Sequence, residues 1–266
     1  MSYNTTNMYD VEPHVAEIYD QIETYTDDIE LLRRLIGGRG PLRILEPFCG
    51  TGRLLIPLAL DGHELMGLDQ AQGMLARARA KIARLPAEVQ ARITLAQADV
   101  TSAEWPQGFA LVILGGNCFY ELATPQEQEQ CLISAAASLH PGGYVYVDNN
   151  HMEGALDESW RSPGVSQGFP TGTCADGTRV ASTKEIIWYD VPRRLVRLRR
   201  GTTVTLPDGS IITKEYVQQK HPVSAVEVQT WLEKHGFLVE QRYGDRAGTP
   251  YTDTSDRAIF WARRTA

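Results

Sequence analysis

Cysteine is scarce in this 266-residue chain, and its four cysteines are scattered. Cys49, Cys118, Cys131 and Cys174 form no CxxC pair and have no metal-like spacing. This pattern excludes a dense disulfide framework and a thiolate metal site. We therefore expect reduced thiols and no bound metal.

Long hydrophobic runs are also missing. No apolar segment approaches the roughly 20 residues that a helix needs to cross a bilayer. The first ten residues, MSYNTTNMYD, are polar, which is not typical of a signal peptide. We therefore expect a soluble, cytoplasmic protein without a membrane partner.

Positive charge is in deficit, because 26 lysines and arginines face 33 aspartates and glutamates, for a net charge of −7. Proteins whose main task is to bind nucleic-acid phosphates usually have a basic surface, so a nucleic-acid partner is disfavoured. The 42% hydrophobic content is enough for one large domain, or for a domain that carries an insertion.

A strand, a glycine turn and a helix are predicted between Leu42 and Leu60. Leu42 and the residues that follow it read LRILE, an apolar run typical of a strand buried on both faces. Gly50 and Gly52 then allow backbone and ligand to approach closely, because glycine has no Cβ. The helix predicted over 53–60 begins at this turn, and its first N–H groups are suited to an anionic group.

Strands and helices alternate after this turn. The predicted strands lie at 63–68, 93–96, 109–114 and 144–148, and the predicted helices at 70–82 and 126–139. Two further strands, at 237–241 and 257–262, follow a helix that begins with the capping box of Ser224 and Glu227. This alternation predicts an α/β fold with a doubly wound, seven-stranded and mostly parallel sheet.

Two additions to that sheet are predicted. Residues 1–40 contain two short helices, which we interpret as an N-terminal helical cap, and 41–151 with 222–266 form the Rossmann-like domain. Residues 152–221 offer strands at 179–188, 194–205 and 211–219 with no convincing helix, which predicts an antiparallel β insert.

The ends of the predicted parallel strands carry polar landmarks. Glu46, Asp69, Asp99 and Asn117 each follow a different strand, so they should meet at the edge of the sheet where ligands bind. In an S-adenosylmethionine site, Glu46 would hold the ammonium group and Asp69 the ribose hydroxyls. Asp99 would accept from the adenine amine, and the Val100 N–H would donate to a ring nitrogen.

A nicotinamide or flavin cofactor is the alternative, since an acidic residue after the second strand also suits a dinucleotide. The stretch Gly50-Thr51-Gly52-Arg53-Leu54-Leu55 lacks the third glycine of G-x-G-x-x-G. A carboxylate at Glu46 is also unfavourable beside a pyrophosphate. Both observations favour the methyl donor.

These motifs together resemble the class I S-adenosylmethionine-dependent methyltransferase family. The matching segments are ILEPFCGTGRLLIPLA, GLDQAQGML, QADV, LVILGGNCFYEL and HPGGYVYVD. The departure is Pro47-Phe48-Cys49, where the family more often has smaller residues, which leaves the contacts of these side chains open. From the motifs and the resemblance, the predicted cofactor-binding residues are Glu46, Gly50, Gly52, Arg53, Asp69, Gln70, Met74, Asp99, Val100 and Asn117.

The acceptor side is less clearly marked. His151, just past the fifth strand, titrates near neutrality and is the candidate base, with a backbone-bonded loop histidine as the simpler alternative. Tyr120 is the second catalytic candidate. The predicted acceptor-binding residues are Tyr19, Asn117, Tyr120 and His151.

The insert resembles the lid of small-molecule members such as glycine N-methyltransferase and the amino-sugar N,N-dimethyltransferases, so it is expected to close an acceptor pocket or to build a homodimer. Five arginines lie between positions 193 and 200. As strand residues, Arg197 and Arg199 would share one face and Arg194 and Arg200 the other. A solvated sheet surface explains them most simply; an anionic substrate or a subunit contact is the alternative.

These observations predict an S-adenosylmethionine-dependent methyltransferase that moves a methyl group to an N or O of a small molecule. The alternatives are a methyltransferase acting on tRNA or another nucleic acid, and a non-catalytic protein that only binds S-adenosylmethionine.

Overall fold

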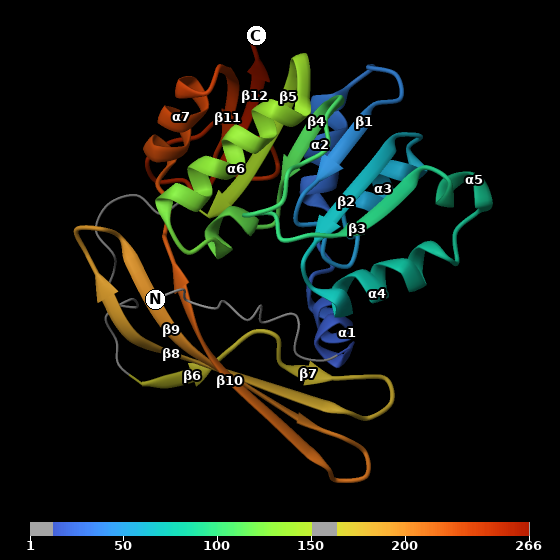
Figure 1. Ribbon diagram of the computed structural model, residues 1–266, viewed down its shortest axis with the longest axis vertical. Coiled ribbons are helices and arrows are strands. Elements are labelled where there is room, and N and C mark those ends of the chain that lie inside the picture. The colour runs from blue at the N-terminus through green and yellow to red at the C-terminus, as the bar shows by residue number, and fades with distance from the viewer. Residues whose placement is uncertain (1–12, 151–163, 266) are drawn as a thin grey trace.

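A seven-stranded sheet forms the centre of the protein (Figure 1). The structure is a computed structural model that describes residues 13–150 and 164–265. The strand order is β11-β12-β5-β4-β1-β2-β3, and only β12 runs antiparallel to its neighbours. This confirms the predicted fold class. The strands are β1 (Arg43–Glu46), β2 (Glu64–Asp69), β3 (Ile93–Gln97), β4 (Phe109–Leu114), β5 (Leu139–Asn150), β11 (Phe237–Tyr243) and β12 (Arg257–Arg264).

Helices cover both faces of this sheet because its central strands are apolar on both sides. Ile44 packs into one hydrophobic cluster and the adjacent Leu45 into the other, as the two-residue period of a strand requires. The first face holds α2 (Asp27–Ile36), α3 (Leu55–Leu60), α4 (Gln72–Ile82) and α5 (Ala87–Gln90), and the second holds α6 (Pro125–Ser138) and α7 (Ala225–Lys234). None of the helices in 13–150 and 164–265 has the length and apolar character to cross a membrane.

Helices α6 and α7 begin with side-chain caps, from Thr124 and Ser224 respectively. The Ser224 hydroxyl accepts from the Glu227 N–H and the Glu227 carboxylate accepts from the Ser224 N–H, so the predicted capping box is confirmed. The helix after the glycine turn begins at Leu55, two residues later than predicted, because residues 50–54 continue the turn. Thr26 precedes α2 without a side-chain cap, and Asp27 accepts from the Asp28 N–H instead.

The insert is a five-stranded antiparallel sheet below the carboxyl ends of the parallel strands (Figure 1). Its strands are β6 (Val165–Gln167), β7 (Gly172–Thr173), β8 (Arg179–Asp190), β9 (Leu195–Thr205) and β10 (Ile211–Lys220). The two shortest strands, β6 and β7, were not predicted, because a strand of two or three residues is too short to show an alternation of apolar and polar side chains.

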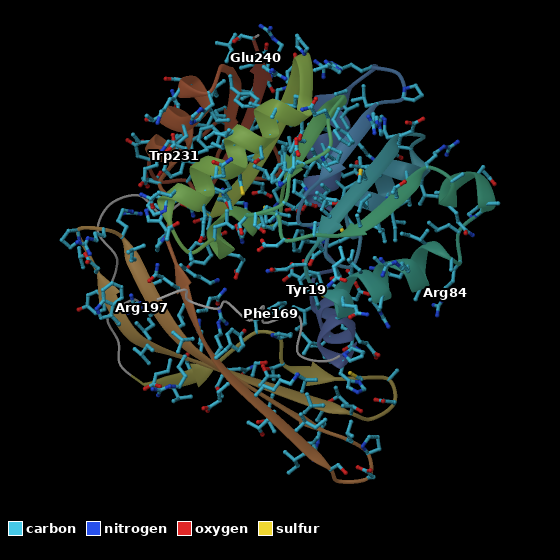
Figure 2. All side chains as sticks on the ribbon, in the orientation of Figure 1. Tyr19, Arg84, Phe169, Arg197, Trp231 and Glu240 are labelled. Carbon is cyan, nitrogen blue, oxygen red and sulfur yellow. The ribbon has the colours of Figure 1, made fainter. Side chains whose placement is uncertain are left out.

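The arginines of 193–200 separate into different environments. Arg199 pairs with Glu185, and Arg197, visible on β9 in Figure 2, donates to Gln219 and lies over the Trp188 ring. Arg200 lies on the opposite face of β9 and donates to Gln218. The assignment of Arg194 to the strand was wrong: it lies before β9 with φ of 52° and donates to the Pro222 carbonyl.

Helix α1 (Pro13–Ile22) lies between the two sheets (Figure 1). Asp20 anchors it, because its carboxylate accepts from Thr51 at 2.6 Å, Arg77 at 2.9 Å and Lys81 at 2.8 Å. Burial alone would raise the pKa of Asp20, but these three donors lower it below its usual value. The glycine turn and α4 are thereby joined to α1.

Gly67 on β2 is a position where the fold requires glycine. A Cβ there would lie 2.5 Å from the Leu55 Cδ1 and 2.7 Å from the Cys49 Sγ. We expect Gly67→Ala to lower the free energy of unfolding by about 1–3 kcal/mol through overpacking. Urea denaturation measures the change. Gly38→Ala is the control, because nothing lies within 4 Å of a Cβ at that position. Equal stability of both variants would contradict the prediction.

Candidate cofactor and acceptor site

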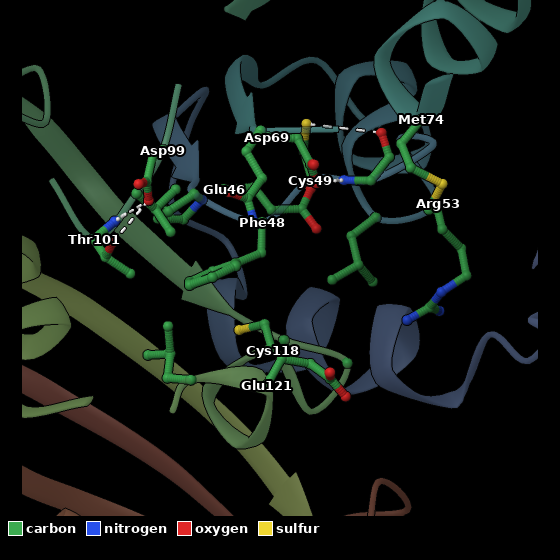
Figure 3. Close-up of a pocket in the computed structure, with 18 of the residues that line it drawn as sticks. Glu46, Phe48, Cys49, Arg53, Asp69, Met74, Asp99, Thr101, Cys118 and Glu121 are labelled. Atoms are coloured by element: carbon green, nitrogen blue, oxygen red, sulfur yellow. Dashed lines mark hydrogen bonds between the residues drawn. The ribbon is translucent and has the colours of Figure 1, made fainter. Parts of the chain in front are cut away.

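A single pocket at the carboxyl ends of β1, β2 and β4 collects most of the predicted residues (Figure 3). The strands end together at this edge because they are parallel, and each chain turn there exposes a polar side chain. The predicted residues that line it are Tyr19, Glu46, Gly50, Arg53, Asp69, Gln70, Met74, Asp99 and Val100.

The glycine turn is held to the end of β2 by Asp69. Gly50 and Gly52 have φ of 52° and 79°, so both residues of the turn adopt the left-handed region that favours glycine. The Asp69 carboxylate accepts from the Gly50 N–H at 2.9 Å and from the Ala71 N–H at 2.8 Å. A carboxylate has about four acceptor sites, so Asp69 keeps the capacity to accept ribose hydroxyls while it shapes the turn.

Glu46, the last residue of β1, is a buried carboxylate that lacks full compensation. It is 5% exposed, and its Oε2 has no hydrogen-bond partner within the described residues. Burial raises the pKa of Glu46 well above its usual value, with Arg53 opposing the rise and Asp28 and Asp69 adding to it. A buried carboxylate is costly unless a cation or donor satisfies it. The ammonium group of a methionine moiety is such a cation, so the residues fit the predicted cofactor.

Arg53 lines the same pocket, but its guanidinium is paired with a carboxylate of α2. Its guanidinium donates to the fully buried Asp28 at 2.9 and 2.5 Å and to the Tyr25 carbonyl at 3.1 Å. It also lies 4.0 Å from the centre of the Tyr25 ring. Arg53 therefore neutralises Asp28 and fixes the start of α3 against α2.

The opposite end of the pocket has the features expected of a binding site for the adenine ring of the cofactor. Asp99 accepts from both the N–H and the hydroxyl of Thr101 on the same oxygen, which fixes the carboxylate at this end (Figure 3). Val100 is buried, and Met74 lies on the α4 side. This pairing of an acceptor with apolar walls is suited to an adenine ring.

Three of the acceptor-side predictions lie away from the pocket lining or outside the described residues. Asn117 accepts with its side chain from the Asn150 N–H at 2.8 Å and from Arg257 at 2.9 Å. Tyr120 makes a cation–π contact with Lys220, whose Nζ is 4.4 Å from the centre of the Tyr120 ring. His151 falls outside the described residues. Tyr19 does line the pocket, and its ring meets Phe169 of the insert edge to face at 5.9 Å (Figure 2).

The pocket also contains residues that the sequence analysis did not single out. Phe48, Cys118, Glu121, Glu127 and Gln218 line it. Glu121 belongs to the 3-10 helix η2 (Cys118–Glu121), and Gln218 comes from β10, so one wall of the pocket is built by the insert. The aromatic residue before the turn was a departure from the family pattern, and that departure was the available signal for Phe48.

Away from this pocket, one group of three possible metal ligands occurs within the described chain. Side-chain atoms of His14, Cys174 and Asp176 lie within 4.8 Å of one another. Cys174 and Asp176 belong to the turn that precedes β8, far along the sequence from the glycine turn.

Comparison with known proteins identifies the domain. Residues 44–143 match the family model described as a methyltransferase domain. A putative methyltransferase of Geobacillus sp. strain WCH70 is 25% identical, over 86% of this chain and 87% of its own length. The dTDP-3-amino-3,4,6-trideoxy-alpha-D-glucopyranose N,N-dimethyltransferase of Streptomyces venezuelae is 27% identical over 59% of this chain and 65% of its own length.

A solved structure extends the likeness to the insert. CalS10, an amino pentose methyltransferase from Micromonospora echinaspora with S-adenosylmethionine bound, superposes with a TM-score of 0.64 at 20% identity. The match covers 96% of this chain and 97% of that one. Several 23S rRNA (uracil-C5)-methyltransferases also match, but this chain spans about a third of their length or less.

The matched domain includes the glycine turn, Asp69 and Asp99, which are the features that fit the methyl donor. Residues 44–143 of this chain therefore form a methyltransferase domain.

Proposed function

We propose that this methyltransferase acts on a small molecule, moving the methyl group to a nitrogen or an oxygen. The observation that carries the proposal is the wall that the insert contributes to the pocket, through Gln218, together with the α1 residue Tyr19. A pocket closed by α1 and a second sheet admits a small acceptor more readily than a folded macromolecule. The likeness to amino-sugar and amino-pentose methyltransferases supports the same substrate class.

The cofactor roles proposed for this chain follow from the geometry of the pocket. Glu46 holds the ammonium of the methionine portion, the Gly50–Gly52 turn admits its carboxylate, and Asp69 accepts from the ribose. S-adenosylmethionine supplies an electrophilic methyl on a sulfonium. The protein aligns the acceptor with that methyl and excludes water, which is most of what an in-line displacement requires.

Two groups are assigned to the acceptor side as part of this proposal. His151 remains the candidate base because it follows β5, and Tyr120, which lies within η2, remains the second catalytic candidate. Burial raises the pKa of the Tyr120 hydroxyl, so it acts as a neutral hydrogen-bonding group rather than as a base. Asn117 positions the end of β5 through Asn150 and Arg257.

The remaining sequence predictions belong to the same proposal. Residues 1–40 act as the cap, 41–151 with 222–266 bind the cofactor, and 152–221 act as the lid or as a dimer element. Cytoplasmic location is supported by four buried, unpaired cysteines. A nucleic-acid acceptor is disfavoured by the net charge of −7.

Asp69 provides the first prediction. Asp69→Asn should weaken binding of S-adenosylhomocysteine by about tenfold or more, because a charged acceptor is lost from the ribose and one amide of the turn loses its partner. Isothermal titration calorimetry measures the affinity. Asp61→Asn is the matched control, because Asp61 pairs with Arg33 outside the pocket. Unchanged affinity in Asp69→Asn would exclude the ribose contact.

Glu46 predicts a pH dependence. The pKa of this carboxyl is raised in the ligand-free protein, and a bound ammonium favours the carboxylate and lowers the pKa again. Cofactor binding should therefore release protons, and affinity should rise with pH through the raised pKa. Calorimetry in two buffers of different ionisation enthalpy counts the protons released, and Glu46→Gln should abolish the release. Equal proton release in wild type and variant would remove Glu46 from the amino-acid end of the site.

The acceptor class is tested by labelling. The protein is incubated with methyl-labelled S-adenosylmethionine and either a small-metabolite extract or total RNA, and the labelled product is identified by mass spectrometry. We expect label in the small-metabolite fraction and none in RNA. Labelled RNA would contradict the small-molecule proposal and would indicate a nucleic-acid acceptor. Cofactor binding without any labelled product would indicate a protein that binds S-adenosylmethionine but does not transfer its methyl group.

A further inference from the structure

Glu121 is a carboxylate on the acceptor side of the pocket, opposite the cofactor residues. It ends the 3-10 helix η2 after β4, and Figure 3 shows it with Cys118 across the pocket from Asp69 and Met74. Its side chain is 31% exposed, whereas the Lys220 side chain that pairs with it is only 4% exposed. The carboxylate is therefore open on the pocket side and closed on the side of the insert.

The insert holds this carboxylate in place. Lys220 donates to one Glu121 oxygen at 2.6 Å, and Gln218 donates to the other at 2.8 Å. Arg200 donates to the Gln218 side-chain oxygen at 3.1 Å, which fixes the amide with its NH₂ group toward Glu121. Each carboxylate oxygen keeps a second acceptor site, so Glu121 remains able to bind a donor in the pocket.

Glu121 is also kept ionised. Burial would raise its pKa, but Lys220, Arg200 and Gln218 together lower the pKa below the usual value. A group with a lowered pKa is a weak base, so its chemistry is to attract positive charge. The other carboxylate of this wall, Glu127, accepts from the Ala123 N–H at 2.7 Å at the start of α6, where it serves the helix.

We propose that Glu121 binds the nitrogen of the methyl acceptor, and that the acceptor is an amine that arrives as an ammonium ion. This inference rests on the proposed small-molecule function and decides between nitrogen and oxygen. The bound ammonium loses one proton to water, and its lone pair then attacks the methyl carbon. The new N–C bond forms as the S–C bond breaks, S-adenosylhomocysteine leaves, and the product carries the positive charge.

The inference can be tested without knowing the acceptor. Sinefungin is an analogue in which a carbon bearing an amine replaces the sulfonium and its methyl, so it places an ammonium at the point of transfer. S-adenosylhomocysteine shares its adenosine and amino-acid portions but has no charge there. The ratio of the two affinities therefore cancels the contributions of Glu46 and Asp69 and isolates the acceptor-side charge.

We expect Glu121→Gln to reduce the preference for sinefungin over S-adenosylhomocysteine by about tenfold in calorimetry, the scale of one charge-assisted hydrogen bond. Glu129→Gln is the control, because Glu129 pairs with Lys234 of α7 and does not line the pocket. An unchanged preference in Glu121→Gln would overturn the inference.

A second variant covers the case in which Glu121→Gln destabilises the protein by leaving Lys220 buried and unpaired. Glu121→Gln combined with Lys220→Met removes both charges and should show the same loss of preference with S-adenosylhomocysteine binding intact. Retention of the wild-type preference in this double variant would equally overturn the inference.

Product analysis completes the test. In the labelling experiment above, the labelled methyl group should be on nitrogen, and an O-methyl product would overturn the amine assignment. If the protein transfers no methyl group at all, the proposed function fails while the affinity ratio still reports on Glu121. The two failures are therefore distinguishable.

Discussion

The geometry of the site depends on the carboxylate of Asp69, which joins two turns of the chain. It accepts from the Gly50 N–H after β1 and from the Ala71 N–H before α4. These bonds keep both turns at the carboxyl edge of the sheet and aim the backbone toward the pocket. Gly67 on β2 has no Cβ, so Leu55 and Cys49 can pack directly against this strand. This close packing brings the glycine turn within hydrogen-bond distance of Asp69 at the end of β2. The cofactor site is therefore a consequence of how β1 and β2 are packed.

The pattern of charge compensation in the described residues favours a cationic ligand in the pocket. The fully buried Asp28 is neutralised by Arg53, and the fully buried Asp148 is bound by Arg246 and Arg257. Glu46, by contrast, keeps one buried oxygen without a partner among the described residues. These two structural carboxylates are thus satisfied internally, whereas Glu46 lines the pocket that is proposed to hold the cofactor. Binding of a cation there recovers part of the desolvation cost.

The sequence was sufficient for the parts of the site that depend on local patterns. The glycine turn, Asp69 and Asp99 each directly follow a readable strand, so their place at one sheet edge could be predicted from alternation alone. The contacts of Asn117 could not be predicted in the same way: its side chain bonds to Asn150 and Arg257, and Arg257 is distant in the sequence. The Glu121–Lys220 pair was missed because its partners are 99 residues apart, on either side of the insert.

That long separation matters for how the insert and the sheet domain work together. The insert contacts the domain through polar pairs that converge near η2: Lys220 and Gln218 bind Glu121, and His221 binds the buried Gln128 at 2.6 Å. Gln128 in turn donates to the Phe119 carbonyl, so η2 is held from both sides. Such bonds are directional, whereas apolar packing tolerates small shifts. The end of β10 therefore fixes η2, which carries Glu121 at the edge of the pocket, relative to the seven-stranded sheet.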